Sequence, residues 1–315
     1  MRYLIIVLAL SLTTTACARG KPFTSKIGIH LIGSYTAGVK KIVAARCPVI
    51  KILDIHQPML DAARDYKAAN PKGIVVLRVF TPIQHEATQD PEERAKLYWE
   101  QVVKPSITRL TPEQKKLIDY VEGPNECELP CWRSVSDAEW IVKFYEALVP
   151  MMVESGLKPC IGNIPVGNPP GPPEEVEAKI RAFIPALRLA KKVGGCWSYH
   201  SYTLKYTKDP GIEIHYSLRY RRFYKTFAKY APDLKNMPII LTEGGVDSDG
   251  SYPGVSGWKR DTAEKFQDWL KWFDSEMKKD RYVKGITLFE IGDPAVWDSF
   301  DLEPMADWLA GYLGG

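Results

Sequence analysis

The sequence predicts a single (β/α)8 barrel. Three observations support this prediction: eight short apolar segments recur along the chain, amphipathic helical stretches separate them, and the chain has 315 residues of which 45% are hydrophobic and 25% charged. Such proportions are typical of a globular protein, and barrels of this class run well past about 200 residues as one domain. They exclude a disordered, collagen-like or disulfide-scaffold chain.

Several of the eight segments are almost continuously apolar, which is typical of parallel strands covered on both faces. In order they are Ile27–His30, Val49–Asp54, Ile74–Phe80, Ile118–Gly123, Pro159–Asn163, Gly195–His200, Pro238–Glu243 and Gly285–Glu290. A doubly wound open sheet is the rival architecture, and it usually carries a glycine-rich phosphate turn. Neither G-x-G-x-x-G nor a P-loop sequence follows any segment, so the barrel is favoured.

The stretches between these segments have helical spacing. Ser136 and Glu139 predict a capping box at the start of one helix, which should end near Gly156. Pro185 predicts a kink or break in the helix between the fifth and sixth strands. The run of prolines and glycines from Gly167 to Pro173 is expected to form a rigid loop and not a domain linker.

Residues 1–18 predict a signal peptide. Arg2 is followed by an apolar stretch that is too short to span a bilayer, and Ala16-Cys17-Ala18 fits a signal cleavage site. Cleavage would leave residues 19–315 as the barrel domain of a secreted or periplasmic protein. The alternative is a lipoprotein signal that ends before Cys17, with a lipid anchor at Cys17, although Thr14 stands where such signals usually carry Leu. No membrane span is expected, because no other stretch approaches 18 apolar residues.

Export to an oxidising compartment would make the cysteines informative. Five remain beyond Cys17, so at least one thiol is free or pairs outside the chain. Cys127 and Cys131 flank Pro130, and this spacing fits either a disulfide or two small buried thiols. A zinc site is disfavoured, because there is no C-x-x-C pair with a nearby His.

Charge and motifs exclude other partners. The chain has 42 basic and 38 acidic residues and a net charge of +4, and it lacks a long basic run, so a nucleic-acid partner is not expected. No cofactor is expected either.

Polar side chains stand at the ends of the predicted strands, where the reacting groups of a barrel gather. Glu126 follows the fourth strand and Glu243 ends the seventh, so we expect them on opposite sides of the barrel mouth. Two carboxyl groups that flank one bond can hydrolyse an acetal, provided that one is kept protonated and the other ionised.

Four motifs together resemble the clan A retaining glycoside hydrolases, over nearly the whole chain after residue 18. They are Gly123-Pro124-Asn125-Glu126, His200-Ser201-Tyr202, Thr242-Glu243-Gly244 and a tryptophan after the last strand, Trp297. The resemblance implies that Glu126 is the general acid/base and Glu243 the nucleophile.

The resemblance also implies roles for substrate-binding residues. Asn125 would bind the sugar 2-hydroxyl, Tyr202 would orient the nucleophilic carboxylate, and His200 would contact the sugar. Trp297 would be the platform under the sugar ring at the cleaved site.

One departure from the clan concerns the positive charge near the nucleophile. The clan usually has an Arg on the second strand, whereas this chain has Lys51 there and Arg78 on the third strand. Either can keep Glu243 ionised. His30, which ends the first strand, is also expected to contact substrate.

Alternatives exist for several residues. Glu122 and Glu128 compete with Glu126, but neither follows Asn, and both are interpreted as structural. A metal site would need His30, His56 and His200, yet the His-x-His of metal hydrolase barrels is missing after the first strand, so none is expected.

Aromatic residues near the strand ends have two interpretations as well. Trp258 and Tyr252 lie near the end of a glycine-rich loop after Glu243 and either border a glycan cleft or pack against the barrel. Strand-end aromatics favour a cleft for a polymer.

The sequence-based hypothesis is retaining, endo-acting hydrolysis of β-glycosidic bonds in an extracytoplasmic poly- or oligosaccharide. It predicts a separation of about 5–5.5 Å between the two carboxyl groups. A non-catalytic glycan-binding barrel and a metal-dependent barrel hydrolase are the alternatives.

Overall fold

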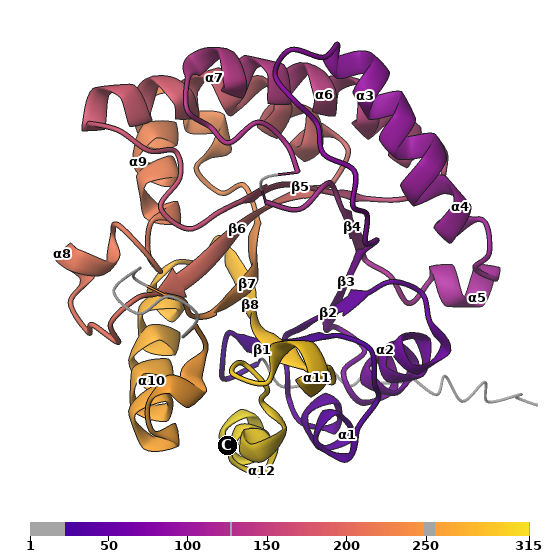
Figure 1. Ribbon diagram of the computed structural model, residues 1–315, viewed down its shortest axis with the longest axis vertical. Helices are drawn as coiled ribbons and strands as arrows, with labels where there is room; N and C mark the ends of the chain where they lie inside the picture. The colour runs from indigo at the N-terminus through magenta and orange to yellow at the C-terminus, as the bar shows by residue number, and fades with distance from the viewer. Residues whose placement is uncertain (1–22, 127, 249–255, 315) are drawn as a thin grey trace, which may run out of the picture.

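Eight parallel strands close into one barrel in the computed structural model, which describes residues 23–126, 128–248 and 256–314 (Figure 1). The strands follow one another around the ring in sequence order, and β8 pairs with β1. Their bounds are β1 Ile27–Leu31, β2 Val49–Leu53, β3 Ile74–Arg78, β4 Tyr120–Glu122, β5 Pro159–Ile164, β6 Cys196–Thr203, β7 Ile239–Val246 and β8 Val283–Ile291. All eight predicted strands are confirmed, and the doubly wound open sheet is excluded.

Helices cover the outside of the barrel (Figure 1). The α-helices are α1 Ala37–Ala44, α2 Gln57–Ala69, α3 Pro91–Tyr98, α4 Lys104–Ile107, α5 Pro112–Lys115, α6 Val135–Glu154, α7 Pro173–Lys192, α8 Pro210–Glu213, α9 Tyr220–Tyr230, α10 Ala263–Lys279, α11 Pro294–Trp297 and α12 Ala306–Gly314. A π-helical turn, η1 (Trp99–Val103), and three 3₁₀ turns, η2 (Pro232–Leu234), η3 (Trp258–Arg260) and η4 (Glu303–Met305), complete the set. No helix of the described residues is long and apolar enough to cross a membrane.

Two expectations about the helices were wrong. The cap of α6 is Ser134, whose hydroxyl accepts a hydrogen bond from the backbone N–H of Asp137, while Ser136 and Glu139 lie within the helix. Two serines in this segment offer alternative caps, and the path of the chain into the helix selects the earlier one. Helix α7 continues through Pro185, so the predicted break is wrong, and the predicted kink stays a prediction; buried side chains on both sides of the proline offset the loss of one N–H donor.

The proline-rich loop before α7 is anchored by hydrogen bonds from two side chains. The phenol of Tyr199 and the guanidinium of Arg219 each donate a hydrogen bond of 3.1 Å to the carbonyl oxygen of Asn168, and Arg219 also donates to the carbonyl of Pro169. The bond between Asn168 and Pro169 is cis. Side chains from β6 and the start of α9 thus fix the loop that follows β5.

The barrel interior has an apolar layer and a polar layer. Alternate residues of a strand face the same side, so each strand contributes to both layers from one face. The apolar layer, toward the N-terminal ends of the strands, consists of Val49, Val76, Cys160, Cys196 and Ile240. Two residues further along the same strands, the interior becomes polar with Lys51, Arg78, Ser198 and Thr242, all of them buried. The sequence therefore closes one end of the barrel with apolar side chains and places charges toward the other.

Some sequence predictions fall outside the described residues. They are the signal peptide with its boundary after residue 18, the anchor at Cys17, the disulfide between Cys127 and Cys131, and the position of Tyr252. These stay predictions. Cys47, Cys160 and Cys196 are buried free thiols.

Gly28 marks a close approach of two strands and provides a test of the barrel. A Cβ atom at this position would lie 1.8 Å from the carbonyl oxygen of Val49 on β2. We expect Gly28→Ala to lower the free energy of unfolding by about 3 kcal/mol, because β1 and β2 must separate. Gly311→Ala in α12, where the added atom meets nothing within 4 Å, should be neutral or slightly stabilising. Urea unfolding measures both, and equal stability of the two variants would contradict the β1–β2 packing.

Candidate active site

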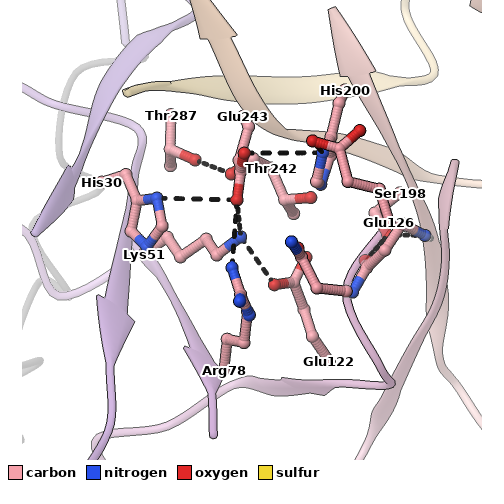
Figure 2. A network of polar contacts seen from close by, with 12 residues as sticks. His30, Lys51, Arg78, Glu122, Glu126, Ser198, His200, Thr242, Glu243 and Thr287 are labelled. Carbon is pink, nitrogen blue, oxygen red and sulfur yellow. Dashed lines mark hydrogen bonds and ion pairs between the residues drawn. The ribbon is translucent and has the colours of Figure 1, made fainter. Parts of the chain in front are cut away.

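The polar layer brings the two predicted glutamates together at the C-terminal ends of the strands (Figure 2). Glu243 lies on β7, Glu126 follows β4, and His200 lies on β6 next to β7. One carboxylate oxygen of each glutamate and a ring nitrogen of His200 all lie within 4.8 Å of one another. The side chain of Glu243 is 5% exposed and that of Glu126 is 30% exposed, so the two acids have different environments.

Two positive side chains and a histidine surround one oxygen of Glu243. Oε1 lies 3.1 Å from Nζ of Lys51 and 3.3 Å from Nη1 of Arg78 (Figure 2). Nδ1 of His30, on β1, lies 3.9 Å from the same oxygen. The sequence left open whether Lys51 or Arg78 supplies the charge, and both contact the carboxylate.

The other oxygen of Glu243 contacts β6. The phenol of Tyr202 donates a hydrogen bond of 3.0 Å to Oε2, and Nδ1 of His200 lies 3.5 Å from it. The same ring nitrogen of His200 lies 3.2 Å from Oε1 of Glu126, so this histidine bridges the two acids.

These contacts set the ionisation of the site. Burial alone would raise the pKa of Glu243, but the surrounding charges, those of His200 and Lys51 foremost, hold the pKa well below its usual range. Burial would lower the pKa of His200, but the two carboxylates outweigh it and raise that pKa. Burial, and then the charge of Lys51, holds the pKa of His30 well below its usual range, so His30 is neutral.

Each cation that contacts Glu243 also has a second acidic neighbour from the β4 segment. Lys51 lies 2.9 Å from Oε2 of Glu122, and both side chains are fully buried. Arg78 lies 3.9 Å from Oε1 of Glu128, whose pKa is raised by burial. Glu122 and Glu128 thus act as counter-ions beneath and beside the site, which accords with their structural interpretation.

Asn125 presents an unused acceptor next to Glu126. Its backbone N–H donates to Oε2 of Glu128 at 2.7 Å. Its side-chain oxygen is buried and finds no hydrogen-bond partner among the described residues. This oxygen is therefore free to accept a hydrogen bond from a ligand hydroxyl.

An aromatic residue that the sequence analysis missed lies close to the site. Phe289, on β8, has its ring centroid 5.5 Å from that of His30. Trp297, the predicted platform, is 41% exposed on α11 and packs edge-on against Phe289 at 5.0 Å. Phe289 therefore lies between Trp297 and the polar layer, and an apolar residue within a strand carries no signal that would single it out.

Trp258 is packed among its neighbours in the part of the chain that the structure describes. Its ring stacks on Phe266 with centroids 6.2 Å apart, and its indole N–H donates to the carbonyl of Asp301 at 3.0 Å. The side chain is 8% exposed. Of the two interpretations of this tryptophan, the structure supports packing.

The geometry of the site argues against a metal ion. Glu126, His200 and Glu243 form the group, among the described residues, whose ligand atoms lie close enough together to hold one. However, Lys51 and Arg78 contact Glu243 and would repel a dication there. His56, the third histidine of the alternative, is 71% exposed and pairs with Asp54.

Glu290, at the end of β8, is a further buried acid. Its Oε1 has no hydrogen-bond partner among the described residues, and its Oε2 accepts from the backbone N–H of Asp293 at 3.1 Å. Burial, aided by the charges of Asp301 and Asp293, raises the pKa of Glu290 to about 8. The side chain is therefore protonated at neutral pH.

The buried Lys51–Glu122 pair gives a stability prediction. We expect Lys51→Met to lower the free energy of unfolding by about 3–5 kcal/mol, because it leaves a buried carboxylate without its cation. The double variant Lys51→Met/Glu122→Gln should recover most of this loss. Denaturant unfolding at pH 7 measures all three proteins, and a double variant that is less stable than Lys51→Met would contradict the pairing.

Glu290 gives a prediction about pH. Its pKa is higher in the folded than in the unfolded protein, so the charge that develops above pH 4.5 in the unfolded chain destabilises the fold. We expect the free energy of unfolding of Glu290→Gln, relative to that of wild type, to rise by about 3 kcal/mol from pH 5 to pH 8. Unfolding curves at the two pH values test this, and a pH-independent difference would exclude a raised pKa.

Comparisons with known proteins identify relatives of the fold. No protein-family model and no curated protein matches the sequence. A glycoside hydrolase family 5 enzyme from Prevotella bryantii B14 aligns with a TM-score of 0.54 and 11% identity over 90% of this chain and 94% of that chain. A GH5-4 broad specificity endoglucanase from an uncultured bacterium gives 0.54 and 11% over 90% and 86%. A mutant of the Prevotella bryantii enzyme in complex with a xyloglucan tetradecasaccharide gives 0.50 and 13% over 90% and 87%. The chain therefore shares the (β/α)8 barrel fold of these clan A glycoside hydrolases.

Proposed function

We propose that the protein is a retaining glycoside hydrolase with Glu243 as nucleophile and Glu126 as general acid/base. The observation that carries the proposal is the pairing of a buried, ionised carboxylate with a more exposed acid whose nearest oxygen lies within 4.8 Å. Retaining enzymes hold the two groups about 5–5.5 Å apart, whereas inverting enzymes need about 6.5–9.5 Å to fit a water molecule. Two carboxyl groups that bring one oxygen of each within 4.8 Å suit the retaining spacing.

In the first step, a carboxylate oxygen of Glu243 attacks the anomeric carbon while Glu126 protonates the departing glycosidic oxygen. The bond to the leaving group breaks and a covalent glycosyl–enzyme forms. In the second step, Glu126 takes a proton from water, and the resulting hydroxide displaces Glu243. The proton that Glu126 loses in the first step is thereby restored.

The neighbours of the acids support these steps. The charges of His200, Lys51 and Arg78 keep Glu243 ionised before attack, and the phenol of Tyr202 fixes its direction. The unpaired oxygen of Asn125 is suited to accept a hydrogen bond from the sugar 2-hydroxyl. His200 would contact the sugar between the two acids, and His30 would face it from β1.

The substrate proposed is a β-linked polysaccharide or oligosaccharide, with β-glucans first. Structural neighbours are described as broad specificity endoglucanases, and one was solved with a xyloglucan oligosaccharide. Exposed aromatic rings at the strand ends, Phe80 at 57% and Trp297 at 41%, suit stacking on successive sugars and hence endo action. The predicted signal peptide supports a secreted or periplasmic enzyme.

The two alternatives make different demands on the site. A non-catalytic glycan-binding barrel would have no need for an ionised carboxylate buried against two cations. A metal-dependent hydrolase would have to bind its dication against Lys51 and Arg78. The variants, the product analysis and the chelator experiment described next distinguish both alternatives from the proposed function.

The catalytic assignment is tested with paired variants. On a polysaccharide that the mature wild type degrades, found with a β-glucan panel, we expect Glu126→Gln and Glu243→Gln to lower kcat by about 10²–10⁴-fold or more, because each removes one partner of the bond cleavage. Glu154→Gln, on the exposed end of α6, is the control and should match wild type. Unchanged turnover in either site variant would remove that residue from the mechanism.

Retention and the role of each acid are tested separately. NMR of the first product should show the β-anomer, and azide should restore turnover of Glu126→Ala with an aryl β-glycoside, yielding a β-glycosyl azide. A chelator should leave activity unchanged. Inhibition by the chelator would favour the metal-dependent alternative, and tight oligosaccharide binding without product would favour the binding module.

A further inference from the structure

The turn that carries Glu126 is held by a side chain from the neighbouring strand. The amide nitrogen Nδ2 of Asn163, on β5, donates hydrogen bonds to the carbonyl oxygens of Gly123 at 3.1 Å and Pro124 at 3.0 Å. These two residues lie directly before Asn125 and Glu126. Asn163 is 1% exposed, so water does not compete for these bonds.

Asn163 is itself fixed in orientation by β6. Its backbone N–H donates to Oγ of Ser198 at 2.9 Å, and the Ser198 hydroxyl donates to its side-chain oxygen. Because that oxygen is used by Ser198, the amide nitrogen must face the carbonyls of the turn. The backbone of Asn163 has a φ of 46°, a left-handed conformation that is uncommon for residues other than glycine and is tolerated best by asparagine and aspartate. A buried asparagine that adopts this conformation and uses its side-chain amide in hydrogen bonds indicates that the neighbouring backbone needs its support.

The requirement lies in the weak pairing between β4 and β5. Strand β4 has three residues, and its register with β5 ends at Glu122 and Cys160. One more ladder bond joins the N–H of Gly123 to the carbonyl of Cys160 at 3.2 Å. Beyond it, β5 departs from regular register at Gly162 and Asn163, so the side chain of Asn163 takes the place of the missing strand pairing.

Glu126 depends on this support more than Glu243 does. Glu243 lies within β7 and has contacts to both carboxylate oxygens. The Glu126 side chain is 30% exposed, and His200 is its one ionic contact among the described residues. The position of its carboxyl group therefore follows the position of the backbone that precedes it.

We propose that Asn163 is a positioning residue for general acid catalysis: together with Ser198 it fixes the Gly123–Pro124 backbone and thereby aims Glu126 at the leaving-group oxygen. The inference rests on the proposed function of Glu126. It assigns to Asn163 an effect on protonation of the leaving group and none on the attack by Glu243.

The test uses Asn163→Gly, which keeps the left-handed backbone accessible and removes both amide hydrogen bonds. The matched control is Asn70→Gly. Asn70 is also buried, and its amide donates to two carbonyls, those of Val43 at 3.0 Å and Ala45 at 2.9 Å, at the opposite end of the barrel. Thermal unfolding confirms that both variants are folded at the assay temperature.

Two probes separate the acid from the nucleophile. Cellohexaose has a sugar alcohol as its leaving group and needs protonation, whereas 2,4-dinitrophenyl β-cellobioside releases a stable phenolate without it. For Asn163→Gly we expect kcat/KM to fall about tenfold or more on cellohexaose and less than about threefold on the aryl glycoside. Asn70→Gly should change kcat/KM by the same factor on the two probes. An equal loss on both probes, or no loss, in Asn163→Gly would overturn the proposal.

Hydrogen exchange measures the protection of the backbone amides and does not depend on activity. The backbone amides of residues 121–123, 125 and 126 should exchange faster in Asn163→Gly than in wild type or Asn70→Gly. Unchanged exchange would overturn the proposal. If wild type cleaves neither probe but exchange is still faster in Asn163→Gly, the result counts against the hydrolase function and not against the support of the turn by Asn163. Ser198→Ala, which leaves Asn163 in place but removes its support, should give the same pattern more weakly and replaces Asn163→Gly if that variant does not fold.

Discussion

The structure depends on one constraint, which is that an ionised carboxylate is kept inside the barrel. Burying the Glu243 charge is costly unless cations and donors surround it. Lys51 and Arg78 meet this need, but they are themselves buried and need acidic partners in turn. Glu122 and Glu128 supply these, so the polar layer is one connected network of buried ion pairs in which no member can be exchanged alone. The fold and the chemistry are therefore coupled through the same residues.

The two acids differ because they are supported differently. Glu243 is part of a strand, and rigid neighbours reach it from β1, β2, β3 and β6. Glu126 stands on a turn with one side open to solvent. In the proposed mechanism this asymmetry is useful, because a nucleophile must stay ionised away from water, whereas an acid/base must exchange a proton with water in the second step. One residue type thus serves two roles through its surroundings.

The sequence predicted the barrel because strands covered on both faces leave continuous apolar runs. It also placed Glu126, Glu243 and Tyr202 near one another, since the ends of parallel strands meet at one side of a barrel. A charged residue inside such a run, as Lys51 is, signals the buried polar layer. The cap at Ser134 and the position of Phe289 were not predictable, because each depends on the path of the backbone and not on residue type. Asn163 was visible as a strand-end polar residue, but its left-handed backbone was not.

The same network of buried ion pairs bears on the alternative functions of the site. A barrel that only bound glycans would be more stable with apolar residues in place of its buried ion pairs, since replacing such a pair by well-packed side chains is often neutral or stabilising. The position of Lys51 between Glu122 and Glu243 therefore agrees with the proposed function, in which the charge on Glu243 is used. A dication would lessen the need for Lys51 and Arg78 and would compete with them for the same oxygen. The presence of two cations on Oε1 thus favours a carboxylate that reacts through its own charge.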